Sequence, residues 1–467
     1  MARLELSPEQ FRKLCEQVAE IATDFLSRLD QREIQPRAGA ADMVRAFEEA
    51  WPREGLGEAA AAKLRNVVEL SRWQNGRFFG YVMGSGEPSG AAADLLASVI
   101  NQNVTSWRSA PAATVIERTV VKWLADAIGC AGFSGSLTGG GSSANLMALA
   151  MARESKLAAN ESGARPGAVY CSAEAHMSIG KSVRLLGIGR KHLRQIAVDS
   201  EFRMNLDELL RAVESDERKG IPPIAIVGTA GTVNTGAIDD LERIADIAQR
   251  HRVWFHVDGA YGALAAIAAP EKFKGIERAD SLSLDPHKWL YQSLDCGCLL
   301  FRDSGAARAA FSHSGDYAKS LLQGELESFM FFDESLELSR RFRGLRLWLS
   351  MQYHGQDAFR AAIGEDLALA QRLAQKIAGE SSLELLAPVP LSAVCFRHKQ
   401  APDGVDLNAW NEKLMKRVVQ RGRVYLSNAT LGGKFALRAC VTNHRTTAAD
   451  VDAVVEEVAA AASQPQA

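Results

Sequence analysis

Short β-rich apolar runs alternate with amphipathic helical segments through the middle of the chain, from about Pro88 to Leu345. The clearest strand-like runs read GAVYCS, IAIVGTA, VWFHVD and CGCLLF, at residues 167–172, 224–230, 253–258 and 296–301. Helical patterns at residues 143–153, 205–215 and 240–251 separate several of them. Strands joined by helices usually pair in parallel and are covered on both faces. We therefore predict an α/β fold around a mostly parallel sheet.

Regions of different pattern flank this part of the chain. The 467 residues exceed the usual size of one compact core, so more than one packed unit is expected. Residues 1–85 are predicted to form a helical N-terminal extension. Its first helix is expected over Ser7–Asp30, with a capping box of Ser7 and Gln10. Residues 86–347 are predicted to form the large domain, and residues 348–467 a small C-terminal α/β domain.

Charge and cysteine usage exclude several classes of function. The net charge of −2 gives no electrostatic reason to expect nucleic acid or an anionic membrane as a partner. No apolar run is long enough to span a bilayer, and the start lacks the pattern of a secretory signal. The seven cysteines are irregularly spaced, which indicates neither a metal site nor a disulfide framework. These features predict a cytoplasmic protein.

The segment DSLSLDPHKWLY holds the first candidate for chemistry. Lys288 follows a proline and a histidine and precedes Trp289, close to several apolar residues. Burial would disfavour the ammonium ion and favour a free amine, which reacts with aldehydes. A surface lysine at the end of a strand is the commoner case, so this segment alone indicates little.

Two more elements lie in similar positions of the β/α pattern. Asp258 ends the strand in WFHVDGAYGA, where an open α/β sheet binds its ligands. A carboxylate there can pair with a protonated ring nitrogen, although a helix-capping aspartate is a serious alternative. The glycine-rich turn Gly139–Gly141 leads through Ser142 into a helical segment. Backbone N–H groups at such a helix start can hold a phosphate.

The three elements together suit one cofactor better than any of them does alone. A phosphate cradle, an acid at a strand end and a lysine further along the chain match a molecule with a phosphate, a basic ring nitrogen and an aldehyde. That combination predicts pyridoxal 5'-phosphate.

The chain also resembles the group II pyridoxal-phosphate decarboxylases, the family of aromatic-L-amino-acid decarboxylase and glutamate decarboxylase. The similarity runs from RFFGYV and SWRSAPAAT to LRACVTNHRTT, over nearly the whole chain. PHKW resembles the aromatic branch, because the glutamate branch usually has methionine after the lysine. The resemblance implies the aspartate-aminotransferase type of fold (fold type I) and decarboxylation of an L-amino acid, most readily an aromatic one.

Roles for individual residues follow from the same resemblance. It implies that Lys288 carries the cofactor as a Schiff base and that Asp258 pairs with the ring nitrogen. His176 would stack on the ring, a role that a lone histidine would not suggest without the family. The residues implied to lie at the phosphate or elsewhere near the cofactor are Gly141, Ser142, Thr232, Asp285 and His287.

Tyr317, in HSGDYAKS, matches the tyrosine on the mobile loop of the aromatic decarboxylases. It would protonate the substrate carbon after CO2 is lost, and relatives with phenylalanine there tend towards aldehyde formation. The family also implies a homodimer with a shared active site. The alternatives are an aldehyde synthase, a carbon–carbon lyase, a different substrate such as an acidic amino acid, and a catalytically silent family member. The intact set of Lys288, Asp258, His176 and Tyr317 argues against the last.

Three positions depart from the family pattern. Val233 and Gly84 stand where the aromatic enzymes have threonines near the cofactor and the substrate carboxylate. Asp285 stands where those enzymes have an asparagine near the phosphate. The first two concern the substrate and leave the predicted cofactor unchanged.

Overall fold

The computed structural model describes residues 4–163, 165–313 and 326–464. Tyr317 lies outside these ranges. In the described part of the chain, no helix is both long enough and apolar enough to cross a membrane.

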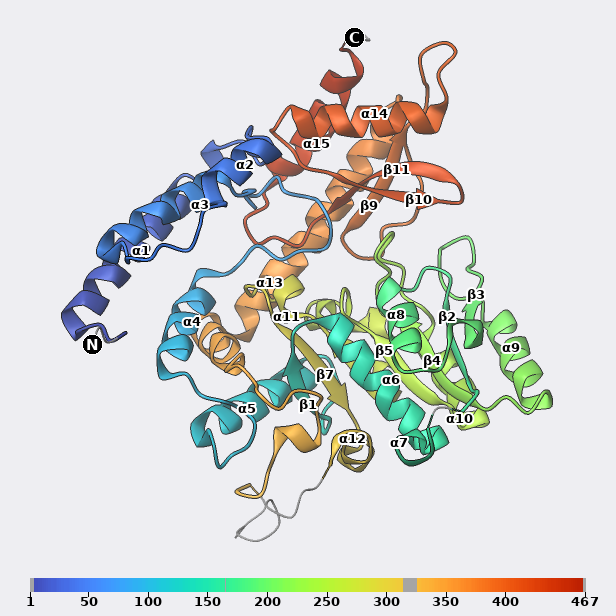
Figure 1. The fold of residues 1–467 in the computed structure, drawn as a ribbon. Helices are drawn as coiled ribbons and strands as arrows, with labels where there is room; N and C mark the ends of the chain where they lie inside the picture. The colour runs from blue at the N-terminus through green and yellow to red at the C-terminus, as the bar shows by residue number, and fades with distance from the viewer. Residues whose placement is uncertain (1–3, 164, 314–325, 465–467) are drawn as a thin grey trace.

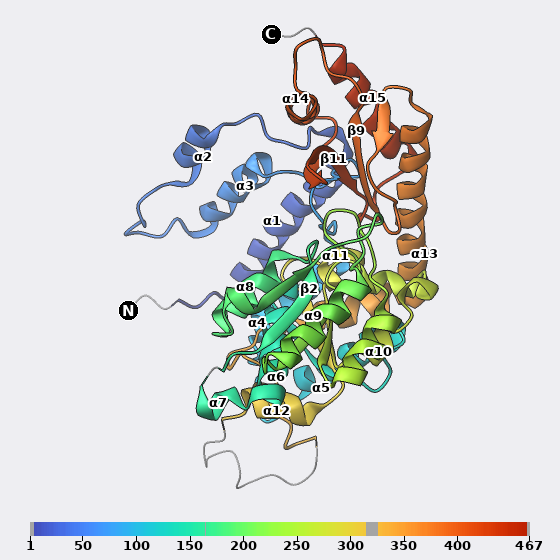
Figure 2. The same cartoon turned by 90° about the vertical axis from the view of Figure 1, so that its right-hand side faces the viewer.

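The N-terminal region is a helical arm beside the main body (Figures 1 and 2). Ser7 and Gln10 form the capping box predicted from the sequence, and α1 follows them. Within this predicted helical extension, residues 48–56 form no helix. The elements of the arm are α1 Pro8–Ser27, η1 Leu29–Gln31, α2 Ala40–Phe47, η2 Gly57–Lys63 and α3 Leu64–Leu70.

A seven-stranded sheet forms the centre of the large unit in the described chain, in the order β1-β7-β6-β5-β4-β2-β3. Strands β3, β2, β4, β5 and β6 run parallel, whereas β7 runs antiparallel to β6 and β1. The mostly parallel α/β sheet predicted from the sequence is therefore confirmed. The strands are β1 Ser134–Thr138, β2 Ala168–Ser172, β3 Leu193–Ile196, β4 Pro223–Thr229, β5 Trp254–Asp258, β6 Ser281–Leu284 and β7 Gly297–Phe301.

Helices cover both faces of this sheet, and alternate residues of each strand point to opposite layers. One core contains residues of α5 Pro111–Ala127, α9 Leu206–Arg218 and α10 Leu241–His251. The other contains residues of α6 Gly141–Leu157, α8 Met177–Leu185 and α12 Ser304–Phe311. The remaining elements of this unit are α4 Pro88–Ile100, α7 Ala159–Ser162, α11 Pro286–Trp289, η3 Arg190–His192, η4 Ala263–Ile267, η5 Pro270–Phe273, η6 Ile276–Arg278 and η8 Phe331–Asp333.

The C-terminal unit has an antiparallel sheet in the order β10-β11-β9-β8, packed against helices. Helix α13, Gly344–Gly379, leads into it and is kinked at Gly355, whose φ is 77°. The predicted boundary at residues 347–348 falls inside α13, and the division into domains stays a prediction. The other elements are β8 Leu383–Leu385, β9 Ala393–His398, α14 Leu407–Gln420, β10 Ser427–Leu431, β11 Lys434–Cys440 and α15 Ala448–Ala462.

Candidate active site

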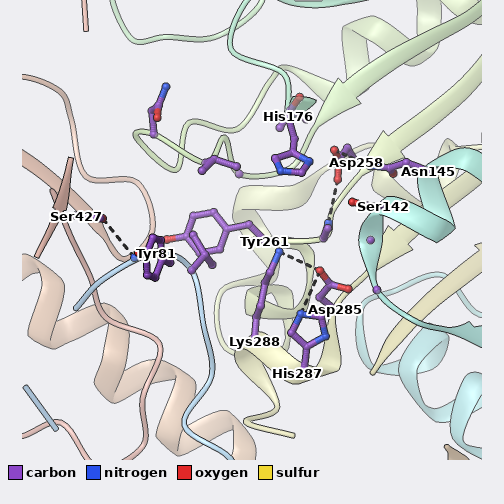
Figure 3. A pocket seen from close by; sticks show the side chains of 18 of the residues that line it. Tyr81, Ser142, Asn145, His176, Asp258, Tyr261, Asp285, His287, Lys288 and Ser427 are labelled. Carbon is purple, nitrogen blue, oxygen red and sulfur yellow. Dashed lines mark hydrogen bonds and ion pairs between the residues drawn. The ribbon is translucent and has the colours of Figure 1, made fainter. Parts of the chain in front are cut away.

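A cavity of about 490 Å³ lies between the carboxyl ends of the parallel strands and the C-terminal unit. Its lining includes Asp258, His287 and Lys288 from the large unit and Ser427 from the small one (Figure 3). Arg438 of the small unit also lines it. An open α/β sheet binds ligands at this edge, because the loops there diverge and leave space.

Asp258 is the last residue of β5 and is almost fully buried. Its Oδ2 accepts a hydrogen bond from Asn145 Nδ2 at 3.0 Å, and its Oδ1 accepts one from Ser283 Oγ at 3.1 Å. The backbone N–H of Ala260 donates to Oδ1 at 3.3 Å. These donors hold the carboxylate in one orientation at the cavity wall, where it can still accept a further hydrogen bond.

Lys288 lies in the short helix α11, which begins directly after β6. Its Nζ is 2.9 Å from Asp285 Oδ2, and His287 Nε2 is 3.6 Å from the same oxygen. His287 Nδ1 is 2.6 Å from the backbone carbonyl of Cys296. Burial lowers the pKa of the His287 imidazole, against the opposing effect of the Asp285 carboxylate. The structure thus brings the three predicted residues of this segment together at one end of the cavity.

The glycine-rich turn joins β1 to α6, and two of its positions, Gly140 and Gly141, favour glycine for different reasons. A Cβ on Gly141 would lie 2.6 Å from Ala260 Cβ and 3.1 Å from Asp285 Oδ2. Gly140 has a φ of 130°, a conformation that favours glycine. Helix α6 begins at Gly141, so its free N–H groups and the Ser142 hydroxyl lie at the cavity. This is the chemistry of an anion site.

Strand β7 begins with a glycine, Gly297, where it packs against this turn. A Cβ on Gly297, between Cys296 and Cys298, would collide with the backbone of Gly140. Glycine in β7 therefore lets the strand approach the cradle closely.

His176 caps the N-terminus of α8 and points towards the cavity (Figure 3). Its Nδ1 accepts from the Ser178 backbone N–H at 3.3 Å and lies 2.8 Å from Ser178 Oγ. This leaves Nε2 as the nitrogen that carries the proton. Burial lowers the pKa of His176, against the opposing effect of the Asp258 carboxylate, and so favours the neutral ring.

Thr232, which the resemblance implies to lie near the cofactor, is not among the residues that line the cavity. Thr232 is buried, and its hydroxyl lies 2.9 Å from the Thr235 hydroxyl and accepts from the Ala237 N–H at 3.1 Å. Its neighbours Gly231 and Val233 line the cavity instead.

A Cβ on Gly84 would collide with the His287 carbonyl, since the backbone here packs directly on the Lys288 turn. The departure at Gly84 therefore has a steric reason.

Sequence reasoning missed two polar residues of the cavity. Asn145 projects from α6 onto Asp258, and a lone asparagine in a helical pattern gives no signal of this role. Arg438, on β11, is nearly fully buried and donates to the carbonyls of Asn234 and Tyr81, both at 3.0 Å. It has no carboxylate partner among the described residues. A buried cation of this kind favours an anionic ligand.

The fold and the cavity together define a pyridoxal-phosphate enzyme of fold type I. The glycine cradle is shaped for a phosphate, Asp258 has a free acceptor site for a ring N–H, and Lys288 offers an amine. Residues 45–399 match the family described as "Pyridoxal-dependent decarboxylase conserved domain", and the chain belongs to this family.

Individual relatives are similar over almost their whole length. Aromatic-L-amino-acid decarboxylase of Bacillus atrophaeus is 32% identical, with 99% of this chain and 97% of the relative covered. 4-Hydroxyphenylacetaldehyde synthase of Rhodiola rosea is 30% identical, with 93% and 91% covered. The crystal structure of Oryza sativa TDC with PLP and tryptamine superposes with a TM-score of 0.92 at 26% identity, covering 99% of both chains.

Proposed function

We propose that this pyridoxal-phosphate decarboxylase converts an aromatic L-amino acid into the corresponding amine and CO2. The observation that carries the proposal is the position of Lys288 and Asp258 around one cavity, with the glycine cradle beside them. The similarity to an aromatic-L-amino-acid decarboxylase over 99% of the chain supports the substrate class.

When bound, the cofactor would supply an aldehyde for the substrate amine and a protonated ring as an electron acceptor. Lys288 would hold the cofactor through its amine and would take part in release of the product. Asp258 would accept a hydrogen bond from the ring N–H and so favour the protonated ring nitrogen. His176, which lines the cavity and whose pKa is lowered by burial, would place the cofactor ring and the substrate. The cradle of Gly141 and Ser142 would hold the phosphate.

An aromatic cluster beside the cavity, formed by Phe78 and Tyr81 near the end of the N-terminal region and Tyr425 of the small unit, favours an amino acid with an aromatic side chain. Phe78 and Tyr425 stack with ring centroids 4.9 Å apart, and the Tyr81 hydroxyl lies 3.2 Å from the Tyr425 hydroxyl. Tyr81 lines the cavity together with Val82. Arg438 supplies positive charge, which attracts the α-carboxylate that every amino-acid substrate carries.

The experiment is an assay of CO2, amine and aldehyde with purified, cofactor-loaded protein. The substrates are the aromatic amino acids and, for the alternative, aspartate and glutamate. We expect CO2 and amine in equal amounts from an aromatic substrate, with Lys288→Ala as the inactive control. Turnover of an acidic amino acid alone would contradict the substrate class. Aldehyde as the main product would favour the alternative represented by the Rhodiola rosea relative.

We also propose a cytoplasmic homodimer, in which the N-terminal arm packs on the partner. Supporting this, α1 buries only Ile21 in its own chain. Apolar side chains left exposed on the arm and on α4 include Phe11, Val18, Val44, Phe47, Val67, Leu95, Leu96 and Val99. An apolar surface of this extent is typical of a protein interface. A loop that carries Tyr317 into the partner's site would make the active site shared.

A further inference from the structure

A row of hydrogen-bonded side chains runs behind the cavity wall from Trp254 to Asp258. Trp254 Nε1 donates to Ser281 Oγ at 2.8 Å, and Ser281 Oγ lies 2.9 Å from His256 Nδ1. His256 Nε2 lies 2.9 Å from Asn145 Oδ1, and Asn145 Nδ2 donates to Asp258 Oδ2 at 3.0 Å. All five residues are buried, and the middle three have almost no exposed surface.

The two ends of the row fix the direction of every hydrogen bond in it. An indole N–H can only donate, so Ser281 Oγ accepts from Trp254 and has its own proton free for His256. An ionised carboxylate can only accept, so Asn145 must present its NH2 group to Asp258. The Asn145 oxygen then faces His256 Nε2, which must carry a proton.

The imidazole in the middle satisfies both requirements in one form. Burial lowers the pKa of His256 to about 4, against the opposing charge of Asp258, so the ring is neutral at neutral pH. The neutral ring with its proton on Nε2 donates to Asn145 and accepts from Ser281 Oγ. The Ser281 carbonyl, at 3.2 Å from Nδ1, is the longer contact and would require the opposite tautomer. The second N–H of Asn145 donates to Ser178 Oγ at 2.9 Å, and this hydroxyl gives its own proton to His176 Nδ1 at 2.8 Å, which further disfavours a flip of the amide.

We propose that His256 is a positioning residue that acts through Asn145 to keep Asp258 an acceptor-only carboxylate facing the ring nitrogen of the cofactor. Without the His256 proton, the Asn145 oxygen would have no donor. The amide could then turn its oxygen onto Asp258 and repel the carboxylate. This inference rests on the proposed role of Asp258, and it assigns to His256 and Asn145 the task of holding the carboxylate in that role.

The ordinary explanation is a buried histidine that merely fills the core with both nitrogens satisfied. The two explanations differ in which substitution restores function. A glutamine at position 256 can place an N–H near the position of Nε2 and donate to Asn145. A leucine fills similar space but leaves the Asn145 oxygen without its donor, which is costly in a buried site.

The test compares His256→Leu with His256→Gln in the full-length protein. The readouts are the dissociation constant of pyridoxal phosphate, the visible spectrum of the bound cofactor, and kcat and KM. His256→Leu should weaken cofactor binding and lower kcat by about tenfold or more, with an altered spectrum and little change in KM. His256→Gln should recover most of both losses. His251→Leu, at the C-terminal end of α10 beside Glu217 and outside the cavity lining, is the matched control and should resemble the wild type.

Ser281→Ala provides a second test, in case His256→Leu fails to fold as judged by circular dichroism. It removes the group that donates to His256 Nδ1 and should shift cofactor affinity and the spectrum in the same direction. Wild-type cofactor affinity and spectrum in folded His256→Leu or Ser281→Ala would overturn the inference. A His256→Gln variant that is as impaired as His256→Leu would also overturn it.

Asp258→Asn separates this inference from the proposed function. If Asp258→Asn abolishes turnover and the variants of the row behave as the wild type, the positioning role fails and the role of Asp258 stands. If Asp258→Asn is fully active, the proposed role of Asp258 fails, and the inference fails with it.

Discussion

Lys288 is the residue on which the chemistry of the cavity depends. It is the lysine that lines the cavity among the described residues, 2.9 Å from Asp285. Borohydride reduction of the cofactor-loaded protein should therefore fix the label on Lys288, as peptide mapping by mass spectrometry would show. Lys288→Ala should yield no labelled peptide. A label on another lysine would remove the basis of the proposed site.

Asp366, a buried residue of α13, should make the free energy of unfolding depend on pH. Its Oδ2 accepts from the Tyr291 hydroxyl at 2.9 Å, and burial raises the pKa of the carboxyl to about 7. In the unfolded chain the pKa of an aspartic acid is about 3.9. Between about pH 4 and 7 the folded state therefore binds a proton at Asp366 that the unfolded chain has released. The stability linked to this group is therefore present at low pH and falls as the pH rises from about 4 to 7.

Asp366→Asn removes the ionisation from the buried site. We expect it to raise the melting temperature at pH 8 by roughly 2 °C or more, and to change it little at pH 5. The exposed neighbour Glu365, replaced by Gln, serves as the control on the same helix. Equal effects of Asp366→Asn at the two pH values would show that ionisation of Asp366 does not affect folding.

At the scale of elements, the strand ends and the turn of the site could be predicted from sequence, because each has a local pattern. Asp258 ends a β-branched strand, and the glycines precede a helix start. The supporting residues could not be predicted in this way. Asn145 and Arg438 approach the cavity from elements far apart in the chain, and nothing in their neighbouring residues indicates it.

The segment that carries Tyr317 is the element whose function depends most on family resemblance. Tyr317→Phe should reduce amine formation at least tenfold with a small change in KM, because a phenol has been removed as the proton donor. Part of the product should become aldehyde. The measurement is product analysis by chromatography beside the kinetics, with Tyr353→Phe, an exposed tyrosine on α13, as control. Normal amine formation without aldehyde would assign the proton to another group.

At the scale of the whole molecule, the shared active site can be tested by mixing two inactive chains. Lys288→Ala lacks the amine, and Tyr317→Phe lacks the phenol. If each site draws these residues from different subunits, a mixed dimer contains about one complete site and one doubly defective site. Activity should therefore return on mixing, measured as amine formation after subunit exchange has been verified with differently tagged chains. Exchange without recovery would place both residues in the same subunit's site.

Helix α13 ties the two units into one structure. In the part that follows the kink at Gly355, Phe359 and Ile363 belong to the core of the large unit, whereas Leu369 and Leu373 belong to the core of the small one. Both hydrophobic cores include side chains of this one helix, so unfolding of either core removes packing contacts from the other. The two units should consequently lose structure in a single calorimetric transition, and a fragment that ends before α13 should fail to reach a folded state.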